Sequence, residues 1–189
     1  MLARTLILWP CALALVAGSL QTRGVNGEPV RPLEPAGIAN VLLFVATDCP
    51  VSNSYAPEIQ RICAASARKG IACTLVYEDP GVTAAGVRRH LDEYRYAGVP
   101  AVIDADGSLA AKVRATITPE AVVVDRGGAV KYRGRIDNFY AALGRPRQVV
   151  TAHDLQDALD ALAAGRPVAP RDAPAIGCYI VPANLRRQP

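Results

Sequence analysis

The stretch VLLFVATDCPVSNSYAPEIQRI, residues 41–62, joins an unbroken apolar run to a short polar turn, a lone cysteine and a helical pattern. If the run is a strand and the sequel a helix, Cys49 stands at the first turn of the helix, where backbone N–H groups have no partners within the helix. Negative charge is favoured there, so the position favours the thiolate form of the cysteine, which is the nucleophilic form. Pro50 suits the first helical position, because no N–H is needed there. The stretch therefore predicts a reactive Cys49.

The same junction leaves a second interpretation open. Asp48 directly precedes the cysteine, and its carboxylate would disfavour a thiolate if it pointed toward the sulfur. An inert cysteine at a strand–helix junction is thus the alternative to a nucleophile.

Composition predicts one globular domain without a nucleic-acid partner. The chain has 189 residues, of which 51% are hydrophobic, and this is enough for a substantial core. The net charge of +4 comes from Lys and Arg residues spread along the chain rather than from a basic block. Clustered basic residues are typical of nucleic-acid interfaces, so we assign no nucleic-acid partner.

The N-terminal segment has the pattern of a secretory signal peptide. Arg4 lies in a short positive head, an apolar stretch follows, and small residues end it. We expect a cleaved signal peptide at 1–23, a linker at 24–36, and export to the periplasm or the extracellular space. The alternative is an uncleaved membrane anchor, which the short apolar run disfavours because a full span takes about 20 residues. Contact with a membrane is expected only in that case.

Export changes how the remaining cysteines are interpreted. Four thiols permit three full pairings in a compartment where disulfides persist, and the four that remain are Cys49, Cys63, Cys73 and Cys178. Cys63 lies beside the apolar face of the helix after Cys49, and Cys73 lies within the next apolar run. Free cysteine is a small hydrophobe that is commonly buried, so we predict both as core residues. Cys49 is then expected to be the most readily alkylated.

The rest of the chain alternates apolar runs with helical patterns, which predicts an α/β fold with helices on the faces of a sheet. Apolar runs at 39–46 and 71–78 flank the first helix, and a second helical pattern at 83–96 leaves His90 on a solvated face. A short strand, an Asp-Gly turn and a short helix follow. The DRGG segment at 125–128 then predicts a hairpin.

The C-terminal part begins with a well-marked helix. Thr151 is placed to cap it, with Asp154 three residues later, and Gly165 and Pro167 end it. The tail at 166–189 is too rich in proline for a helix and too apolar around IGCYIV for a plain linker. We expect this irregular tail to run across the domain.

These motifs resemble those of the thioredoxin-like superfamily, in particular its redoxin branch, which includes peroxiredoxins and membrane-linked thiol oxidoreductases. The family motif is Cys-x-x-Cys at the start of the first long helix, with a helix-kinking proline eight residues after the first cysteine. Here CPVSNSYAP puts Cys49 at the first position, Ser52 at the second and Pro57 at the kink. The resemblance covers a domain at about 37–165.

The resemblance implies a central mixed sheet flanked by helices, with Cys49 as a catalytic nucleophile. An inserted strand, an Asp-Gly turn and a short helix precede a Thr-Pro pair in redoxins, and Thr118 and Pro119 match that pair. They are expected to form a cis bond that faces the cysteine and presents a backbone edge to a substrate. Thr47 or Ser52 is placed to hydrogen-bond a peroxide or the thiolate. The resemblance implies no cofactor and no metal.

The motif departs from the family at its second position. Ser52 cannot close a disulfide with Cys49, so a second sulfur must come from elsewhere. Cys178 is the candidate, because some peroxiredoxins carry a resolving cysteine in a comparable C-terminal position; a cysteine that only packs in the tail is the alternative. Gly177 would let the backbone pass close to the domain, so we expect Cys178 to dock beside Cys49. The expected apolar anchors are Ile176, Tyr179 and Ile180.

Two features weaken a peroxiredoxin assignment. Leu42 and Ala46 occupy the positions of the proline and threonine in the peroxiredoxin signature. An arginine from a late strand approaches the thiolate in such proteins, but Arg133 and Arg135 are better interpreted as exposed residues at a strand end.

The sequence therefore predicts an exported thiol oxidoreductase that uses Cys49 for thiol–disulfide exchange, for hydroperoxide reduction as an antioxidant activity, or for both. The expected partners are a protein or small-molecule thiol, disulfide or hydroperoxide, together with a thiol reductant. Two alternatives stay open. One is a Cu(I)-handling carrier of this fold, although Asn53 stands where its second cysteine is usual, and the other is a catalytically silent interaction domain.

Overall fold

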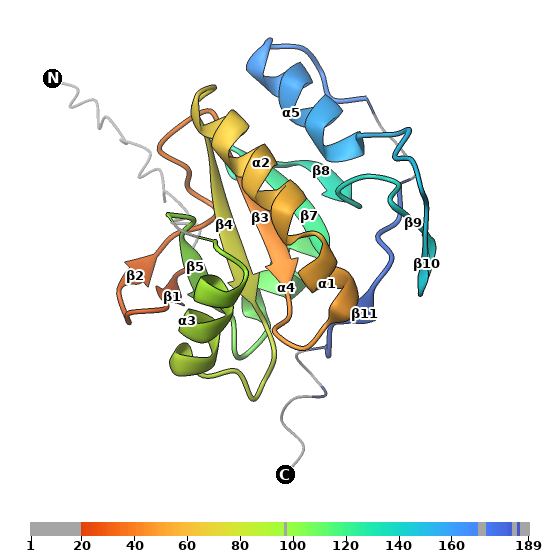
Figure 1. Cartoon of the computed structure of the whole chain (residues 1–189). Coiled ribbons are helices and arrows are strands. Elements are labelled where there is room, and N and C mark those ends of the chain that lie inside the picture. The colour runs from red at the N-terminus through yellow and green to blue at the C-terminus, as the bar shows by residue number, and fades with distance from the viewer. Residues whose placement is uncertain (1–19, 97, 170–172, 183–184, 186–189) are drawn as a thin grey trace, which may run out of the picture.

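The computed structural model describes residues 20–96, 98–169, 173–182 and 185, and shows a mixed sheet with helices on both faces (Figure 1). The helices are α1 Pro50–Ser54, α2 Ala56–Ala67, α3 Ala84–Glu93, α4 Ser108–Val113 and α5 Asp154–Ala163. The main sheet contains β1 Thr22–Gly24, β2 Pro29–Val30, β3 Ala39–Val45, β4 Ile71–Tyr77, β5 Ala101–Ile103, β7 Glu120–Asp125 and β8 Val130–Gly134. Two short ladders join β6 Ile117–Thr118 to β11 Cys178–Tyr179, and β9 Tyr140–Ala142 to β10 Arg145–Pro146. Within these described ranges, every helix is too short or too polar to cross a membrane.

The directions of the central strands decide which segments meet at one edge of the sheet. The strand order is β2-β1-β5-β4-β3-β7-β8. β3 runs parallel to β4 and antiparallel to β7, with Phe44 opposite both Val76 and Glu120. The carboxyl ends of β3 and β4 therefore lie at the same edge as the start of β7. Cys49 follows β3 and Thr118–Pro119 precedes β7, so the two sequence motifs meet at this edge.

All seven residues of β3 are buried, because each face of the sheet carries its own apolar core. Residues of α1, α2, α3 and α5 pack on one face, and α4 covers the other (Figure 1). A strand that is covered on both faces is apolar at successive positions instead of alternating. This is why the apolar run that begins at residue 41 is unbroken.

Several expected elements are confirmed, including the α/β class. A break at Tyr55 separates α1 from α2, and Pro57 lies in the first turn of α2. β7 and β8 form the expected hairpin, whose turn is held by the carboxylate of Asp125 accepting from the Gly127 and Ala129 N–H groups at 2.9 Å. The inserted strand β5 and helix α4 are also present.

The segment expected to be a linker instead extends the sheet. β1 pairs antiparallel with β5, with Arg23 opposite Ile103, and β2 pairs with β1. Part of the segment expected to be a linker at 24–36 is therefore strand, because β1 covers the hydrogen-bonding edge of β5 and β2 pairs with β1. The signal peptide expected at 1–23 lies mostly outside the described residues. Because β1 begins at Thr22, a boundary at residue 23 would cut through this strand.

The cap expected for the last helix is wrong. α5 begins at Asp154 with His153 as its N-cap residue, and no side chain caps it. Thr151 is engaged elsewhere: its N–H donates to Oδ1 of Asn138 at 2.9 Å, and its hydroxyl accepts from the Asn138 amide at 2.8 Å. The loop before α5 is thus fixed by a side chain from the preceding loop, which local sequence spacing cannot reveal.

Cys63 and Cys73 are buried as predicted, but they form a disulfide rather than two free thiols. Cys63 lies on α2, and Cys73 lies on β4, against which α2 packs. Their Cα atoms are 5.6 Å apart, within the usual range for a disulfide. The free-thiol prediction fails because the return from helix to strand brings the two cysteines together.

Removing this disulfide should lower the stability of the protein without affecting the other two cysteines. The ten-residue separation of the cysteines predicts a loss of about 2–3 kcal/mol from the free energy of unfolding. Denaturant unfolding of the Cys63→Ser/Cys73→Ser double variant measures this loss. An unchanged unfolding midpoint would contradict a stabilising role.

Candidate functional site

Cys49 caps the N-terminus of α1, as the sequence predicts. Its backbone is extended, with φ −85° and ψ 108°, and the backbone N–H of Ser52 donates to its Sγ at 3.4 Å. The hydroxyl of Ser52 accepts instead from the Ala46 N–H at 3.4 Å and ties α1 to the end of β3. Ser52 therefore contacts the cysteine through its backbone and not through the side chain that the sequence analysis proposed.

Thr118 approaches Cys49 from the start of β7. The Thr118–Pro119 peptide bond is cis, as expected. Sγ of Cys49 donates to the carbonyl oxygen of Thr118 at 3.3 Å, which confirms that this pair faces the cysteine. The buried carboxylate of Glu120 accepts from the Thr116 N–H at 2.7 Å and so fixes the segment that carries Thr118. Burial raises the pKa of the Glu120 carboxyl above its ordinary value.

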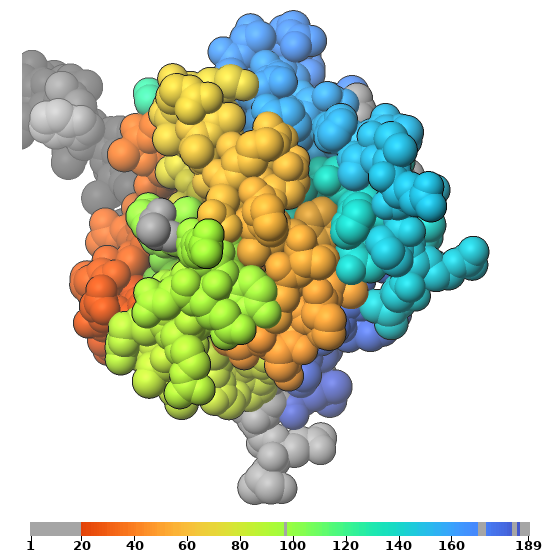
Figure 2. All heavy atoms as spheres, viewed as in Figure 1, coloured from red at the N-terminus to blue at the C-terminus, as the bar shows by residue number. Residues whose placement is uncertain are grey.

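The tail adds a third segment to this edge of the sheet (Figure 1). β11 pairs antiparallel with β6 and places Cys178 opposite Thr118, and the Ile180 N–H donates to the Thr116 carbonyl at 2.9 Å. A Cβ atom on Gly177 would lie 2.0 Å from the carbonyl oxygen of Thr118, so this close approach requires glycine. In Figure 2 the blue atoms of the tail emerge beside the orange atoms of α1.

The docked tail brings two free thiols together. Sγ of Cys178 donates to Sγ of Cys49 at 2.6 Å, and both cysteines are free. This confirms that Cys178 docks beside Cys49. Burial, followed by the hydrogen bond and the charge of Cys49, raises the pKa of the Cys178 thiol to about 12. Cys178 is therefore protonated near neutral pH and serves as the hydrogen-bond donor.

The apolar anchors of the tail are only partly as expected. Ile180 is buried, whereas the side chain of Tyr179 is 86% exposed and anchors nothing in the fold. Successive side chains of a strand point to opposite faces, so Tyr179 faces away from the domain when Cys178 and Ile180 face it. Ile176 is half-buried.

Comparisons with known proteins extend these observations. No protein-family model matches the sequence, and no curated protein matches it. A hypothetical protein from Sinorhizobium meliloti 1021 has a TM-score of 0.74 at 25% identity, over 87% of this chain and 91% of that one. An uncharacterized conserved protein from Geobacillus kaustophilus has a TM-score of 0.74 at 27% identity, over 87% of this chain and 88% of that one. A secreted Mycobacterium tuberculosis disulfide oxidoreductase homologous to E. coli DsbE has a TM-score of 0.55 at 18% identity. The match covers 78% of this chain and 96% of that one.

The chain has the thioredoxin-like fold. The sheet, the helix that begins at Cys49 and the cis pair Thr118–Pro119 occupy the places that the family resemblance implied. The ladder between β6 and β11 adds the tail to this arrangement.

Other residues considered from the sequence have different contacts within this thioredoxin-like site. Thr47 acts through its backbone, because its carbonyl accepts from the Asn53 side-chain amide at 3.1 Å. Arg133 donates to the Arg114 carbonyl at 3.1 Å, and Arg135 donates to the Asp154 carboxylate at 2.7 Å. Both arginines therefore contact groups other than the sulfur of Cys49.

His90 was expected on a solvated face and is instead buried, which corrects the sequence prediction. Its Nδ1 lies 2.8 Å from the Tyr77 hydroxyl, and its Nε2 lies 2.9 Å from Oδ1 of Asn53. Because the Asn53 amide nitrogen donates to Thr47, Oδ1 must accept from His90, and Nε2 carries the proton. A continuous chain of hydrogen bonds thus links Tyr77 in the core to the Thr47 carbonyl, two residues before Cys49.

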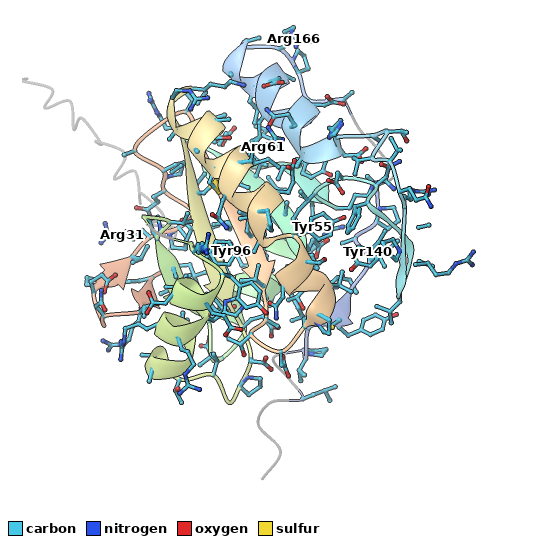
Figure 3. The ribbon with its side chains drawn as sticks, viewed as in Figure 1. Arg31, Tyr55, Arg61, Tyr96, Tyr140 and Arg166 are labelled. Atoms are coloured by element: carbon cyan, nitrogen blue, oxygen red, sulfur yellow. A yellow bond between two sulfur atoms is a disulfide. The ribbon has the colours of Figure 1, made fainter. Side chains whose placement is uncertain are left out.

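Aromatic residues attach the β9 segment to the junction of α1 and α2. The hydroxyl of Tyr55 donates to Oδ1 of Asp137 at 2.8 Å, and the hydroxyls of Tyr140 and Ser54 are 3.1 Å apart. The rings of Tyr55 and Tyr140 have centroids 6.0 Å apart, and both residues are labelled in Figure 3. Burial raises the pKa of Tyr55, which keeps its hydroxyl a donor.

Asp137 also belongs to the one group of three potential metal ligands among the described residues, with Glu58 and His153. Asp137 already accepts from Tyr55 and Phe139, and Glu58 accepts from Arg61. These hydrogen bonds account for the placement of both carboxylates without a metal ion.

The buried His90 should make stability depend on pH. Burial lowers the pKa of His90 below its usual 6.5, so the unfolded chain binds the proton more readily than the folded chain. The stabilisation is complete above about pH 6.5 and decreases as the pH falls below it. We expect His90→Gln to lower the free energy of unfolding at pH 8 by about 1–3 kcal/mol, because buried partners lose their hydrogen bonds. The difference from wild type should narrow at pH 5.

Thermal unfolding of the wild type and His90→Gln between pH 5 and pH 8 measures this difference. His153→Gln is the control, since His153 is the other histidine and is exposed. If the difference in free energy of unfolding between the wild type and His90→Gln widened as the pH fell, it would be inconsistent with a neutral, buried His90.

Proposed function

We propose that the protein is a thiol–disulfide oxidoreductase whose redox pair is Cys49 and Cys178. The observation that carries the proposal is the 2.6 Å separation of the two free sulfurs at the N-terminus of α1. A disulfide between these residues needs only a small further approach of the sulfurs, since a disulfide bond is about 2.05 Å long. The tail would supply the second thiol that Ser52 does not.

The first step is attack by the Cys49 thiolate on one sulfur of a disulfide substrate. A mixed disulfide forms between Cys49 and that sulfur, while the other substrate sulfur leaves as a thiolate. The Ser52 N–H already points at the attacking sulfur, and it favours negative charge there whether or not the tail is docked. When Cys49 is deprotonated, its hydrogen bond to the Thr118 carbonyl is lost.

The second step is attack by Cys178 on the sulfur of Cys49. Cys178 loses its proton as it attacks, a disulfide forms between the two cysteines, and the second substrate thiolate leaves and takes up a proton. One substrate disulfide has then gained two electrons and become two thiols, and the protein has lost two electrons. The raised pKa of Cys178 delays this step until an acceptor for the proton is present. A thiol reductant would restore the starting dithiol.

Hydroperoxide reduction is the weaker candidate within the same chemistry. Attack of Cys49 on a hydroperoxide would give a sulfenic acid and an alcohol, and Cys178 would then form the same disulfide with loss of water. The arginines considered for such a role contact Glu120, Arg114 and Asp154 instead of Cys49. Leu42 and Ala46 stand in the peroxiredoxin signature positions.

A Cu(I) carrier is less well supported than an oxidoreductase. Asn53, which replaces the usual second cysteine, is hydrogen-bonded to His90 and Thr47. With metal–sulfur bonds of about 2.3 Å, the sulfurs of Cys49 and Cys178 would have to separate to roughly 4 Å before an ion could bridge them. The same pair of thiols is also an argument against a catalytically silent interaction domain.

Export of the protein is part of the proposal. The Cys63–Cys73 disulfide supports it, because structural disulfides persist in oxidising compartments and are rare in the cytosol. The similarity to a protein described as secreted points the same way. We therefore place the protein in the periplasm or the extracellular space, with attachment to a membrane only if the N-terminal segment is retained.

The redox pair is tested by oxidising the reduced protein with one equivalent of a disulfide-containing peptide. We expect the wild type to lose the mass of two hydrogens and to yield a linked peptide pair containing Cys49 and Cys178. Cys178→Ser should stop at a mixed disulfide with the peptide, and Cys49→Ser should not react. Turnover with a thiol reductant should fall by about tenfold or more in either variant.

The Cys63→Ser/Cys73→Ser double variant is the matched control and should form the same link as the wild type. Absence of a Cys49–Cys178 link in the wild type would refute the proposal. Replacing the peptide by a hydroperoxide, or by Cu(I) under reducing conditions, tests the two alternatives: turnover of the hydroperoxide favours the first, and stoichiometric retention of the metal favours the second.

A further inference from the structure

The tail occupies the backbone edge beside Cys49 as an extended, cysteine-bearing chain. It runs antiparallel to β6 and pairs Cys178 with Thr118, directly before Pro119. The Thr118 hydroxyl donates to the Cys178 carbonyl at 3.5 Å, and the Ile180 N–H donates to the Thr116 carbonyl at 2.9 Å. The ladder aims the sulfur of Cys178 at Cys49. A substrate polypeptide that presented its own sulfur to Cys49 along this edge would need the same backbone groups.

The docked tail also shields the attacking sulfur. Cys49 is only 1% exposed, although it lies at a helix N-terminus at the edge of the sheet. Gly177 passes so close to Thr118 that even one methyl group would not fit between them. With the tail in place, an external disulfide cannot reach Cys49 along this edge. The expectation that Cys49 is the most readily alkylated cysteine stays a prediction, and the burial of Cys49 beside the more exposed Cys178 bears on it.

We propose that segment 173–180 is a built-in competitor for the edge of β6, and that its release admits an extended polypeptide bearing a disulfide. The inference rests on the proposed function, because it assigns the substrate class and the regulation of the same two-cysteine site. The tail first leaves so that Cys49 can attack, and it then returns so that Cys178 can displace the substrate. Docking and undocking are thus successive steps of one cycle.

The attachment of the tail is weak enough for such exchange. β11 is two residues long, whereas the central strands pair over six or seven residues. Beyond this ladder, the Arg135 N–H donates to the Ala173 carbonyl at 2.9 Å, and Ile180 is buried. Segments held by few backbone hydrogen bonds and few buried side chains open locally long before a protein unfolds.

Two substitutions release the tail without removing either thiol. Gly177→Ala places a Cβ atom 2.0 Å from the Thr118 carbonyl oxygen, and Ile180→Ser removes the buried anchor by an independent route. Gly81→Ala is the matched control, because Gly81 is exposed and a Cβ atom there meets no atom within 4 Å. All three are made in the full chain, and thermal unfolding verifies that each variant remains folded.

The measurement is the rate of iodoacetamide alkylation at Cys49, with Cys49 and Cys178 reduced and the Cys63–Cys73 disulfide intact, followed by peptide mass mapping. The rate is taken from the plateau of its pH profile, where the fraction of thiolate no longer matters. We expect Gly177→Ala and Ile180→Ser to raise this rate by about tenfold or more, and Gly81→Ala to leave it unchanged. The Michaelis constant for a disulfide-bearing peptide should fall in the two release variants.

Equal alkylation rates in the wild type and both release variants would overturn the inference. If the Cys49–Cys178 link still formed on oxidation, the proposed redox pair would stand while the competitor role failed. Faster alkylation in both release variants, without any such link in the wild type, would retain the tail as a cover for Cys49 and refute the redox pair.

Discussion

The antiparallel pairing of β7 with β3 is the constraint on which the site depends. β3 ends at Val45, shortly before Cys49 caps α1, and a parallel neighbour on that side would start at the opposite edge of the sheet. Because β7 runs in the other direction, its first residues lie beside the end of β3, with Glu120 opposite Phe44. Thr118 is thereby brought to the sulfur, and the edge of β6 becomes available to the tail.

The hydrogen bonds of the Cys49 sulfur are made with backbone groups and one thiol. Its described partners are the Ser52 N–H, the Thr118 carbonyl and the Cys178 thiol. His90 reaches the same loop only through Asn53. Each of these partners is fixed by secondary structure or by a buried network, so the geometry around the sulfur follows from the fold.

Local patterns in the sequence were sufficient for much of the fold and of the site. The unbroken run before Cys49 predicted a central strand, and Pro57 predicted the break between α1 and α2. Gly177 predicted the close passage of the tail, and the structure places this glycine against the Thr118 carbonyl. In each case the signal lies within a few residues of the feature that it predicts.

The features that the sequence analysis missed arise from contacts between distant segments. His90 looks polar and solvated on its own helix, yet Tyr77, Tyr94 and Tyr96 surround its ring. β1 and β2 look like a linker because their pairing depends on a distant segment: β1 pairs with β5, and β2 pairs with β1. The choice between two core thiols and a disulfide depends on how α2 packs on β4, which no local pattern encodes.

The position of the Cys63–Cys73 disulfide has a consequence for the fidelity of oxidative folding. Cys63 lies in the C-terminal half of α2. The path along α1 and α2 from Cys49 to Cys63 corresponds to roughly 20 Å. Cys73 lies near the start of β4, opposite Val41 of β3. It is therefore away from the edge of the sheet where Cys49 and Cys178 meet. Once the sheet and α2 have formed, Cys49 cannot attack the structural disulfide of its own chain. The folded protein is thereby protected against disulfide shuffling, although two of these four cysteines remain free thiols.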